Sequence, residues 1–288
     1  MAMRLLKETK GFRGDLWKLV NYAPEVIYAF YYFKRSKDPE KALKKVINTV
    51  TRNPGLEELL KVKKTYEMIL RTEKNAEKIN WVYACQEALK ETGVNYEIIG
   101  KENIPEKGAL YISNHPYGLI DAIMLIGGLG SLINKKGRGL KVITMNQLKF
   151  VKGLEEAVYF VDSIRKSLRY LDEGGDLALY PSGGMSKANL EEYPWKNGLE
   201  KFISRSSSVV PMWFSGPDHA KIYNFFAKSK REELKNIFSL DGIWNKEGET
   251  VILNIGKPIS SKKLKEIEDP EERVQHLRDI AENLKVAV

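Results

Sequence analysis

Beyond about residue 95 the chain alternates short apolar runs with helical patterns, and this alternation constrains the fold more than any other feature. The apolar runs predict strands at 96–99, 109–113, 140–144, 177–180, 209–214 and 251–255. The patterns between them predict helices at 119–133, 164–173, 195–206, 220–236 and 270–286. Strands that alternate with helices form a largely parallel sheet covered by helices. We therefore expect an α/β fold with a mixed, largely parallel sheet flanked by helices, whose ligand site lies in the loops beyond the strand ends.

Residues 1–94 differ from the rest of the chain, because their sequence predicts helices that follow one another without strands between them. Asp38-Pro39-Glu40 is typical of a helix start, with Asp38 as the N-cap and Pro39 at the first helical position. Apolar residues then recur at helical spacing until Asn53-Pro54-Gly55 ends the pattern. We expect two parts, a helical N-terminal region over 1–94 and an α/β domain over 95–288.

Residues 16–33 form an unusually aromatic segment. Lys18, Asn21 and Glu25 interrupt it and Lys34-Arg35 closes it, so it is too short and too polar to span a bilayer. Aromatic rings and basic residues favour the headgroup region, which predicts a helix lying in the membrane interface. A helix packed on the rest of the protein explains the same pattern, and both interpretations stay open.

The expected location follows from the same residues. No uncharged apolar run is long enough to span a membrane, and the N-terminus lacks a signal-peptide pattern. We expect a cytoplasmic protein that is peripheral on the inner face of the membrane.

Composition limits the partners. The net charge of +9 favours phospholipid, coenzyme phosphates, an acidic carrier protein or nucleic acid, although a lysine-rich surface also serves solubility alone. No basic stripe interleaved with aromatics lies outside the N-terminal segment, so nucleic acid is not expected. The single cysteine, Cys85, excludes an internal disulfide and fits a reducing cytosol. One cysteine and three histidines are too few for an ordinary zinc site, so no metal is expected.

His115 and Asp121 flank the turn after the predicted strand 109–113. On a continuous helix a separation of six residues would place them about 240° apart. They meet only if the intervening turn is not helical, and Pro116-Tyr117-Gly118 supplies such a turn. A carboxylate bonded to one imidazole nitrogen makes the other a better base. Alternatively, Asp121 is simply a first-turn acid favoured by the helix dipole.

The loop after the predicted strand 177–180 contains Ser182-Gly183-Gly184. Paired glycines let backbone N–H groups approach a ligand oxygen, as an anion site or an oxyanion site requires, but they also make ordinary turns. Of the two remaining histidines, His219 is expected in a surface loop that enters a helix. His276 is expected on the solvated face of a charged C-terminal helix.

Together these loops resemble one family. Their order and spacing resemble those of the glycerolipid acyltransferase superfamily over about residues 95–288. The motif that contains His115 resembles the hemolysin-like branch of that superfamily. This branch includes acyltransferases acting on acyl-amino-acid lipids such as lyso-ornithine lipid. The motifs are Asn114-His-Pro-x-Gly-x-x-Asp121, Tyr180-Pro-Ser-Gly-Gly-x-Ser186, Val209-Val-Pro-x-x-x-x-Gly216 and Ile255-Gly-Lys-Pro258, with Trp195-x-x-Gly198, Asn146-Gln-Leu148 and Val151-x-Gly153 between them.

The resemblance implies acyl transfer from acyl-CoA or acyl carrier protein to a hydroxyl or amine of a membrane lipid acceptor. It makes His115 the general base and Asp121 its orienting acid, with no cofactor beyond the acyl thioester as cosubstrate and no metal. It also implies an acceptor-binding and oxyanion-binding set, comprising Asn114, Ser182, Gly183, Gly184 and Ser186.

Two departures from the family pattern bear on the acceptor. The usual His-x4-Asp is His-x5-Asp here, and Ser182 and Met185 replace the glutamate and arginine of the Pro-Glu-Gly-Thr-Arg loop. Arginine is the natural bidentate phosphate clamp, so its absence weighs against glycerol-3-phosphate and lysophosphatidate. Arg138 and Lys187 are candidate substitutes for binding an anion. A catalytically silent protein that binds lipid or acyl carrier, and an acyl thioesterase, remain alternatives.

Overall fold

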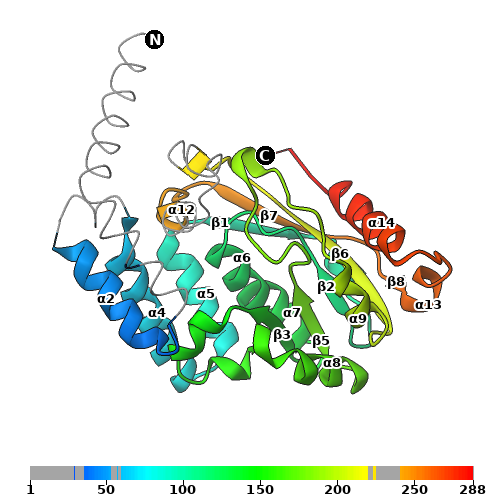
Figure 1. Ribbon diagram of the computed structural model, residues 1–288, viewed down its shortest axis with the longest axis horizontal. Helices are drawn as coiled ribbons and strands as arrows, with labels where there is room; N and C mark the ends of the chain where they lie inside the picture. The colour runs from blue at the N-terminus through cyan, green and yellow to red at the C-terminus, as the bar shows by residue number, and fades with distance from the viewer. Residues whose placement is uncertain are drawn as a thin grey trace, which may run out of the picture.

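The computed structural model describes residues 29, 36–52, 57, 60–219, 223–224 and 241–287. Its sheet has eight strands in the order β1-β7-β6-β2-β5-β3-β4, with β8 paired to β6 (Figure 1). The strands are β1 (Asn95–Ile99), β2 (Leu110–Ile112), β3 (Leu140–Thr144), β4 (Val158–Phe160), β5 (Asp176–Leu179), β6 (Ser208–Ser215), β7 (Thr250–Ile255) and β8 (Ile259–Ser260).

Most neighbouring strands run parallel. β6, β2, β5, β3 and β4 form a continuous parallel series, and β1 is parallel to β7. The two antiparallel pairings are those of β6 with β7 and of β6 with β8. The predicted mixed, largely parallel sheet is therefore confirmed. Because β2, β5 and β6 are parallel, the loops that follow them meet at one edge of the sheet.

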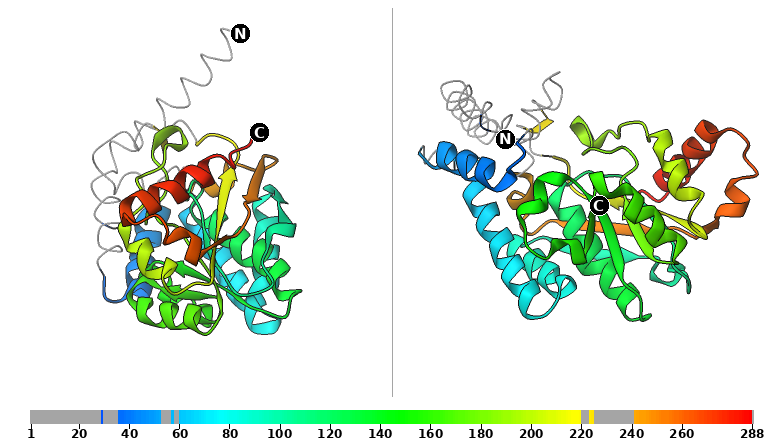
Figure 2. Two further views of the ribbon diagram at one scale, coloured as in Figure 1. Left: turned by 90° about the vertical axis from the view of Figure 1, so that its right-hand side faces the viewer. Right: turned by 60° about the horizontal axis from the view of Figure 1, so that its bottom comes forward.

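Helices cover both faces of the sheet. Within the described part of the chain, the α-helices are α2 (Pro39–Thr51), α4 (Val62–Lys78), α5 (Trp81–Thr92), α6 (Leu119–Ile123), α7 (Gly130–Asn134), α8 (Ile164–Asp172), α9 (Glu200–Ile203), α12 (Asp241–Trp244), α13 (Ser261–Leu264) and α14 (Pro270–Glu282). Helices α4, α5 and α6 share one hydrophobic core with the sheet, and α8, α9 and α14 share the other. The right-hand view of Figure 2 shows the blue and cyan helices at one end of the molecule and red α14 at the other.

Side-chain alternation in β2 explains why the sheet has two buried faces. Leu110 and Ile112 belong to one core, whereas Ala109 and Tyr111 belong to the other. Successive strand residues point to opposite faces, so each face of this short central strand contributes to a separate core. Its burial on both faces is typical of a strand inside a parallel sheet.

The helix start predicted at Asp38-Pro39 is confirmed. Asp38 caps α2 by accepting from the N–H of Lys41, and Pro39 is its first residue. Asn80 caps α5 in the same way, and Gly93 ends that helix with a φ of 69°. The core that contains α5 is continuous with the sheet. Whether the chain divides into two domains at residue 94 stays a prediction.

The structure differs from the predicted elements in several places. The helix expected at 119–133 contains a π-helical stretch, η2 (Met124–Leu129), where Gly127 lies against α5 and accepts from Gln86 Nε2 at 3.0 Å. The helix expected at 195–206 is reduced to η7 (Asn197–Leu199) and α9. Strands β4 and β8 were missed because runs of two or three residues show no alternation.

Some predictions fall outside the described residues. The aromatic segment 16–33 is described only at residue 29, and the helix expected at 220–236 only at residues 223–224. Among the described helices, none has the length and apolarity needed to cross a membrane.

Candidate active site

His115 lies in the loop after β2, at the edge of the sheet where β5 and β6 also end (Figure 1). Its Nδ1 lies 2.9 Å from Asp121 Oδ2, in the first turn of α6. The backbone N–H of Tyr117 donates to the same carboxylate oxygen at 2.8 Å. Residues 116–118 are not helical, as predicted, so the turn brings His115 and Asp121 together.

Gly118 makes this turn possible. Its φ of 62° lies in the region that favours glycine. A Cβ added there would lie only 2.8 Å from Met185 Sδ, so the loop after β5 packs directly on this glycine. A larger residue at 118 would strain the backbone and force the Met185 side chain to move.

The electrostatics of the pair suit a general base. Asp121 is fully buried, and burial raises the pKa of its carboxyl, while His115 and the Tyr117 N–H lower it. The His115 side chain is 17% exposed. No described residue hydrogen-bonds Nε2, so with Nδ1–H donated to Asp121 the Nε2 lone pair faces outward. This arrangement can accept a proton from a bound molecule.

Two residues to which the sequence analysis assigned no role hold His115 in place. The Tyr180 ring stacks on the imidazole, with centroids 3.8 Å apart and planes at 12°. Glu192 Oε1 accepts from the backbone N–H of His115 at 3.3 Å and from the hydroxyl of Ser186. Ser186 in turn donates its backbone N–H to the His115 carbonyl at 2.9 Å. Glu192 lies outside every motif, and no local pattern in the sequence indicated it.

The glycine loop closes partly on itself. Ser182 Oγ donates to the Gly184 carbonyl at 2.9 Å, and the Gly183 N–H donates to the Tyr180 carbonyl at 2.9 Å. Gly183 has a φ of 70°, and a Cβ there would lie 2.6 Å from Lys196 Nζ. Gly184 has open space around it, and its N–H makes no hydrogen bond within the described part of the chain. Gly184 is therefore the member of this turn that remains available to a ligand.

Asn114 is buried, and both ends of its amide bond the backbone of Phe214. Of the expected acceptor-binding and oxyanion-binding residues, Ser182, Gly183, Gly184 and Ser186 thus lie in the loop that contacts His115. Asn114 joins β2 to β6 instead of facing a ligand.

The structure does not bring both candidate anion-binding residues to this loop. Arg138 lies before β3 and contacts Asp176 at the amino end of β5, with Nη1 to Oδ2 at 3.4 Å. Lys187 follows Ser186 but pairs with Glu191 at 2.6 Å. Lys196 was not predicted, yet its ammonium lies over Gly183 with no ion-pair partner among the described residues.

His219 corrects an expectation. It is 6% exposed rather than on the surface. Its ring lies edge-on to Tyr117 at 5.9 Å and 4.1 Å from the Tyr223 ring. The loop after β6 therefore folds back over the site, which the Pro-Asp-His sequence alone does not indicate. His276 is exposed on α14, as expected.

An apolar cavity of about 70 Å³ lies between helices α4 and α5 and the sheet. Leu119 and Ala122 line it from α6, the helix that carries Asp121. Burial raises the pKa of Cys85, which also lines it, to about 12, so this thiol is not a ready nucleophile. The other lining residues are Met68, Ile69, Thr72, Trp81, Ala88, Ile123, Ile126, Val142, Thr144, Leu148, Val151, Leu154 and Val158.

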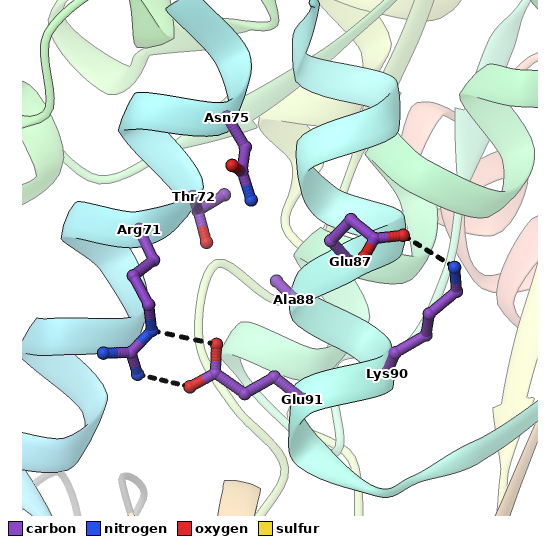
Figure 3. Close-up of a pocket in the computed structure, with 7 residues that line it drawn as sticks. All are labelled: Arg71, Thr72, Asn75, Glu87, Ala88, Lys90 and Glu91. Carbon is purple, nitrogen blue, oxygen red and sulfur yellow. Dashed lines mark hydrogen bonds and ion pairs between the residues drawn. The ribbon is translucent and has the colours of Figure 1, made fainter. Parts of the chain in front are cut away.

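A second pocket, of about 380 Å³, lies on the outer side of α4 and α5 (Figure 3). Two ion pairs border it, Arg71 with Glu91 and Lys90 with Glu87. These four charged side chains lie on helices and pair with one another. The pocket therefore contributes no chemistry to the site around His115.

Within the described residues no cluster of three or more His, Cys, Asp or Glu is arranged to hold a metal ion.

Comparison with known proteins gives a distant structural likeness. No protein-family model matches the chain, and no curated protein matches it. Among solved structures, the chain is similar to the 1-acyl-sn-glycerophosphate (LPA) acyltransferase PlsC from Thermotoga maritima. The two are 14% identical with a TM-score of 0.44, over 90% of this chain and 93% of that one.

Proposed function

We propose that this protein is an acyltransferase that moves a fatty acyl group from an acyl-CoA or acyl-carrier-protein thioester to a hydroxyl or amine of a lipid acceptor. The observation that carries the proposal is the His115–Asp121 pair, 2.9 Å apart, with the carboxylate buried and the imidazole Nε2 open. The motif loops after β2 and β5 support the same chemistry, because they meet at one edge of the sheet, where Ser186 contacts His115.

The proposed step needs only groups that the chain supplies. Nε2 of His115 takes the proton of the acceptor O–H or N–H as the acceptor oxygen or nitrogen attacks the thioester carbonyl carbon. The C–S bond then breaks, and the departing thiolate takes the proton from the imidazolium. Asp121 stabilises that imidazolium and holds its Nδ1–H. The open N–H of Gly184 is the group we assign to the oxyanion.

The apolar cavity beside α6 is the place we propose for the acyl chain. It lies next to the helix that carries Asp121, and almost all of its lining is apolar. At about 70 Å³ it holds only part of a fatty acyl chain, so a long chain must part the side chains around it. Replacing Ala122 by leucine is expected to raise the KM for palmitoyl donors more than for butyryl donors.

Lys196 suggests the class of acceptor. Its ammonium lies over Gly183, where the arginine of a phosphate clamp is missing. A lysine ammonium is a point charge that attracts an anionic group. We propose an acceptor with an anionic headgroup, such as an acyl-amino-acid lipid.

The protein is proposed to work peripherally on the cytoplasmic face of a membrane. The support is the net charge of +9 and the aromatic, basic composition of residues 16–33. Binding to anionic vesicles that weakens steeply with salt would support this placement. Equal binding to neutral and anionic vesicles would contradict an electrostatic contribution.

The experiment is acyl transfer by the wild-type protein beside His115→Ala, with His276→Ala, at an exposed residue of α14, as the matched control. Palmitoyl-CoA and palmitoyl-carrier protein would be offered with a panel of lysolipids and acyl-amino-acid lipids, and products read by mass spectrometry. We expect product from the wild type and from His276→Ala, and a loss on the order of 10²–10⁴-fold in His115→Ala.

Two other outcomes would overturn the proposal. Free fatty acid released at the same rate without acceptor would identify a thioesterase. Tight binding of donor or vesicles without any product would identify a silent binding protein.

A further inference from the structure

The main chain of His115 is held by a segment far along the sequence. Its N–H donates to Glu192 and its carbonyl accepts from the N–H of Ser186. Tyr180 stacks on the ring, and only the Nδ1 contact with Asp121 comes from the local turn. Residues 180–192 therefore set the position of His115 as much as its own loop does.

Glu192 is the most heavily used residue of that segment. It is 6% exposed, and its Oε1 accepts from both the His115 N–H and the Ser186 hydroxyl. Its Oε2 is buried and has no partner within the described part of the chain. Burying a carboxylate with one oxygen unpaired is costly, so packing alone does not explain an acid at this position.

The backbone before Glu192 is strained. Asn189 and Leu190 have φ values of 55° and 59°. Asparagine tolerates this left-handed region, but leucine rarely adopts it. Such strain persists where the surroundings enforce it, and here it precedes the turn that directs Glu192 inward.

The neighbouring acid provides a contrast. Glu191 points outward and pairs with Lys187, and its side chain is 66% exposed. Exposed pairs of this kind contribute little to stability. Of these two adjacent glutamates, only Glu192 contacts His115.

We infer that Glu192 is a positioning residue for His115, joining the histidine main chain to Ser186 so that the imidazole and the glycine loop keep one relative geometry. The inference rests on the proposed acyl transfer for its catalytic meaning. Misplacing a catalytic group by about 1 Å can cost on the order of 10²-fold in rate. Tyr223, which donates to the Ser186 carbonyl at 2.7 Å, supports the same contact from the other side.

The kinetic test compares Glu192→Ala, Glu192→Gln and Glu191→Ala with the wild type, using the acceptor found above. We expect Glu192→Ala to lower kcat on the order of 10²-fold, with little change in the KM for the acyl donor. Glu192→Gln keeps an acceptor oxygen and is expected to recover most of that loss. Glu191→Ala should stay within about twofold of wild type, since its exposed pair is weak. On a His115→Ala background, Glu192→Ala should have no further effect.

A second measurement does not depend on turnover. With only three histidines in the chain, imidazole nitrogen NMR can follow His115 separately, with His115→Ala identifying its signals. Glu192→Ala should shift or broaden the His115 signals, and Glu191→Ala should leave them unchanged. If the wild type transfers no acyl group but the His115 signals respond as expected, the proposed function fails and the positioning contact stands.

The inference is overturned by a folded Glu192→Ala protein with wild-type kcat and unchanged His115 signals. Circular dichroism and thermal unfolding establish that the variant is folded. If Glu192→Ala does not fold, Ser186→Ala decides the question, because it removes the hydroxyl that donates to Glu192. Wild-type kcat and wild-type His115 signals in that variant would equally overturn the inference.

Discussion

Asn114 and Phe214 are joined by two hydrogen bonds, with Asn114 Nδ2 donating to the Phe214 carbonyl at 2.9 Å and the Phe214 N–H donating to Asn114 Oδ1 at 2.7 Å. β2 ends at Ile112, so the amide continues the pairing of β2 with β6 beyond the last strand residue. A side chain thereby does what a peptide group does within the sheet. It also anchors the residue immediately before His115.

We predict that Asn114→Ala destabilises the protein. The substitution leaves a buried N–H and a buried carbonyl of Phe214 unpaired, and each such group costs roughly 1–3 kcal/mol. Thermal or denaturant unfolding should therefore show a loss of roughly 2 kcal/mol or more. Asn114→Asp retains an acceptor but no donor, so it should fall between the two. Unchanged stability in Asn114→Ala would mean that this pair does not hold the strands together.

Asp121→Asn is predicted to remove the effect of Asp121 on the His115 imidazole while leaving the packing of the turn intact. An amide of the same shape still fills the buried site but no longer favours the Nδ1–H tautomer or stabilises the imidazolium. We expect kcat to fall on the order of 10²–10⁴-fold while the KM for the acyl donor changes little. A variant with near wild-type kcat would show that Asp121 serves only the turn, as a first-turn acid accepting from Tyr117.

The sequence predicted the sheet well because its strands are strongly apolar and separated by clear helical patterns. β3 matches its prediction residue for residue, at 140–144. The continuous helix at 119–133 was wrong in detail because the π-helical stretch arises from the close approach of α5 at Gly127, a tertiary contact. Strand β8 is too short for its periodicity to be seen.

The site was predictable where its residues are neighbours in the chain or belong to the family's motifs. His115 and Asp121 lie in one short turn, and the Pro-Tyr-Gly between them indicated their meeting. Glu192 reaches His115 from 77 positions away, so no spacing in the sequence could indicate it. Arg138 and Lys187 were plausible by charge, but charge alone does not say which carboxylate a lysine or arginine already pairs with.

Lys196→Gln tests the acceptor site. If the ammonium binds an anionic acceptor group, its loss should raise the KM for that acceptor about tenfold, since a charge-assisted hydrogen bond contributes roughly 1.5 kcal/mol. Uncharged acceptors should be unaffected, and Lys196→Arg should retain most of the affinity. Lys201→Gln, at an exposed residue of α9, is the control. A larger rise in the acceptor KM for Lys187→Gln would mean that Lys187, the residue predicted from the sequence, binds the anionic group instead.

Glu192→Gln is predicted to change how stability depends on pH. Burial raises the pKa of Glu192, outweighing the hydrogen bonds from Ser186 and His115 that lower it. The folded protein therefore binds this proton more tightly than the unfolded chain does, where a glutamate titrates at about 4.3. Its stabilising contribution is complete below that pH and is lost as the pH rises through the raised folded value.

Glutamine does not titrate, so the stability of Glu192→Gln does not fall for this reason as the pH rises. The unfolding temperature of Glu192→Gln relative to wild type should rise between acidic and neutral pH, with each unit of pKa difference corresponding to about 1.4 kcal/mol. Asp121 titrates in both proteins and cancels from the comparison. Glu191→Gln, at the exposed neighbour, should follow the wild type throughout. A difference between Glu192→Gln and wild type that stays constant with pH would mean that Glu192 is not buried as a carboxylate beside His115.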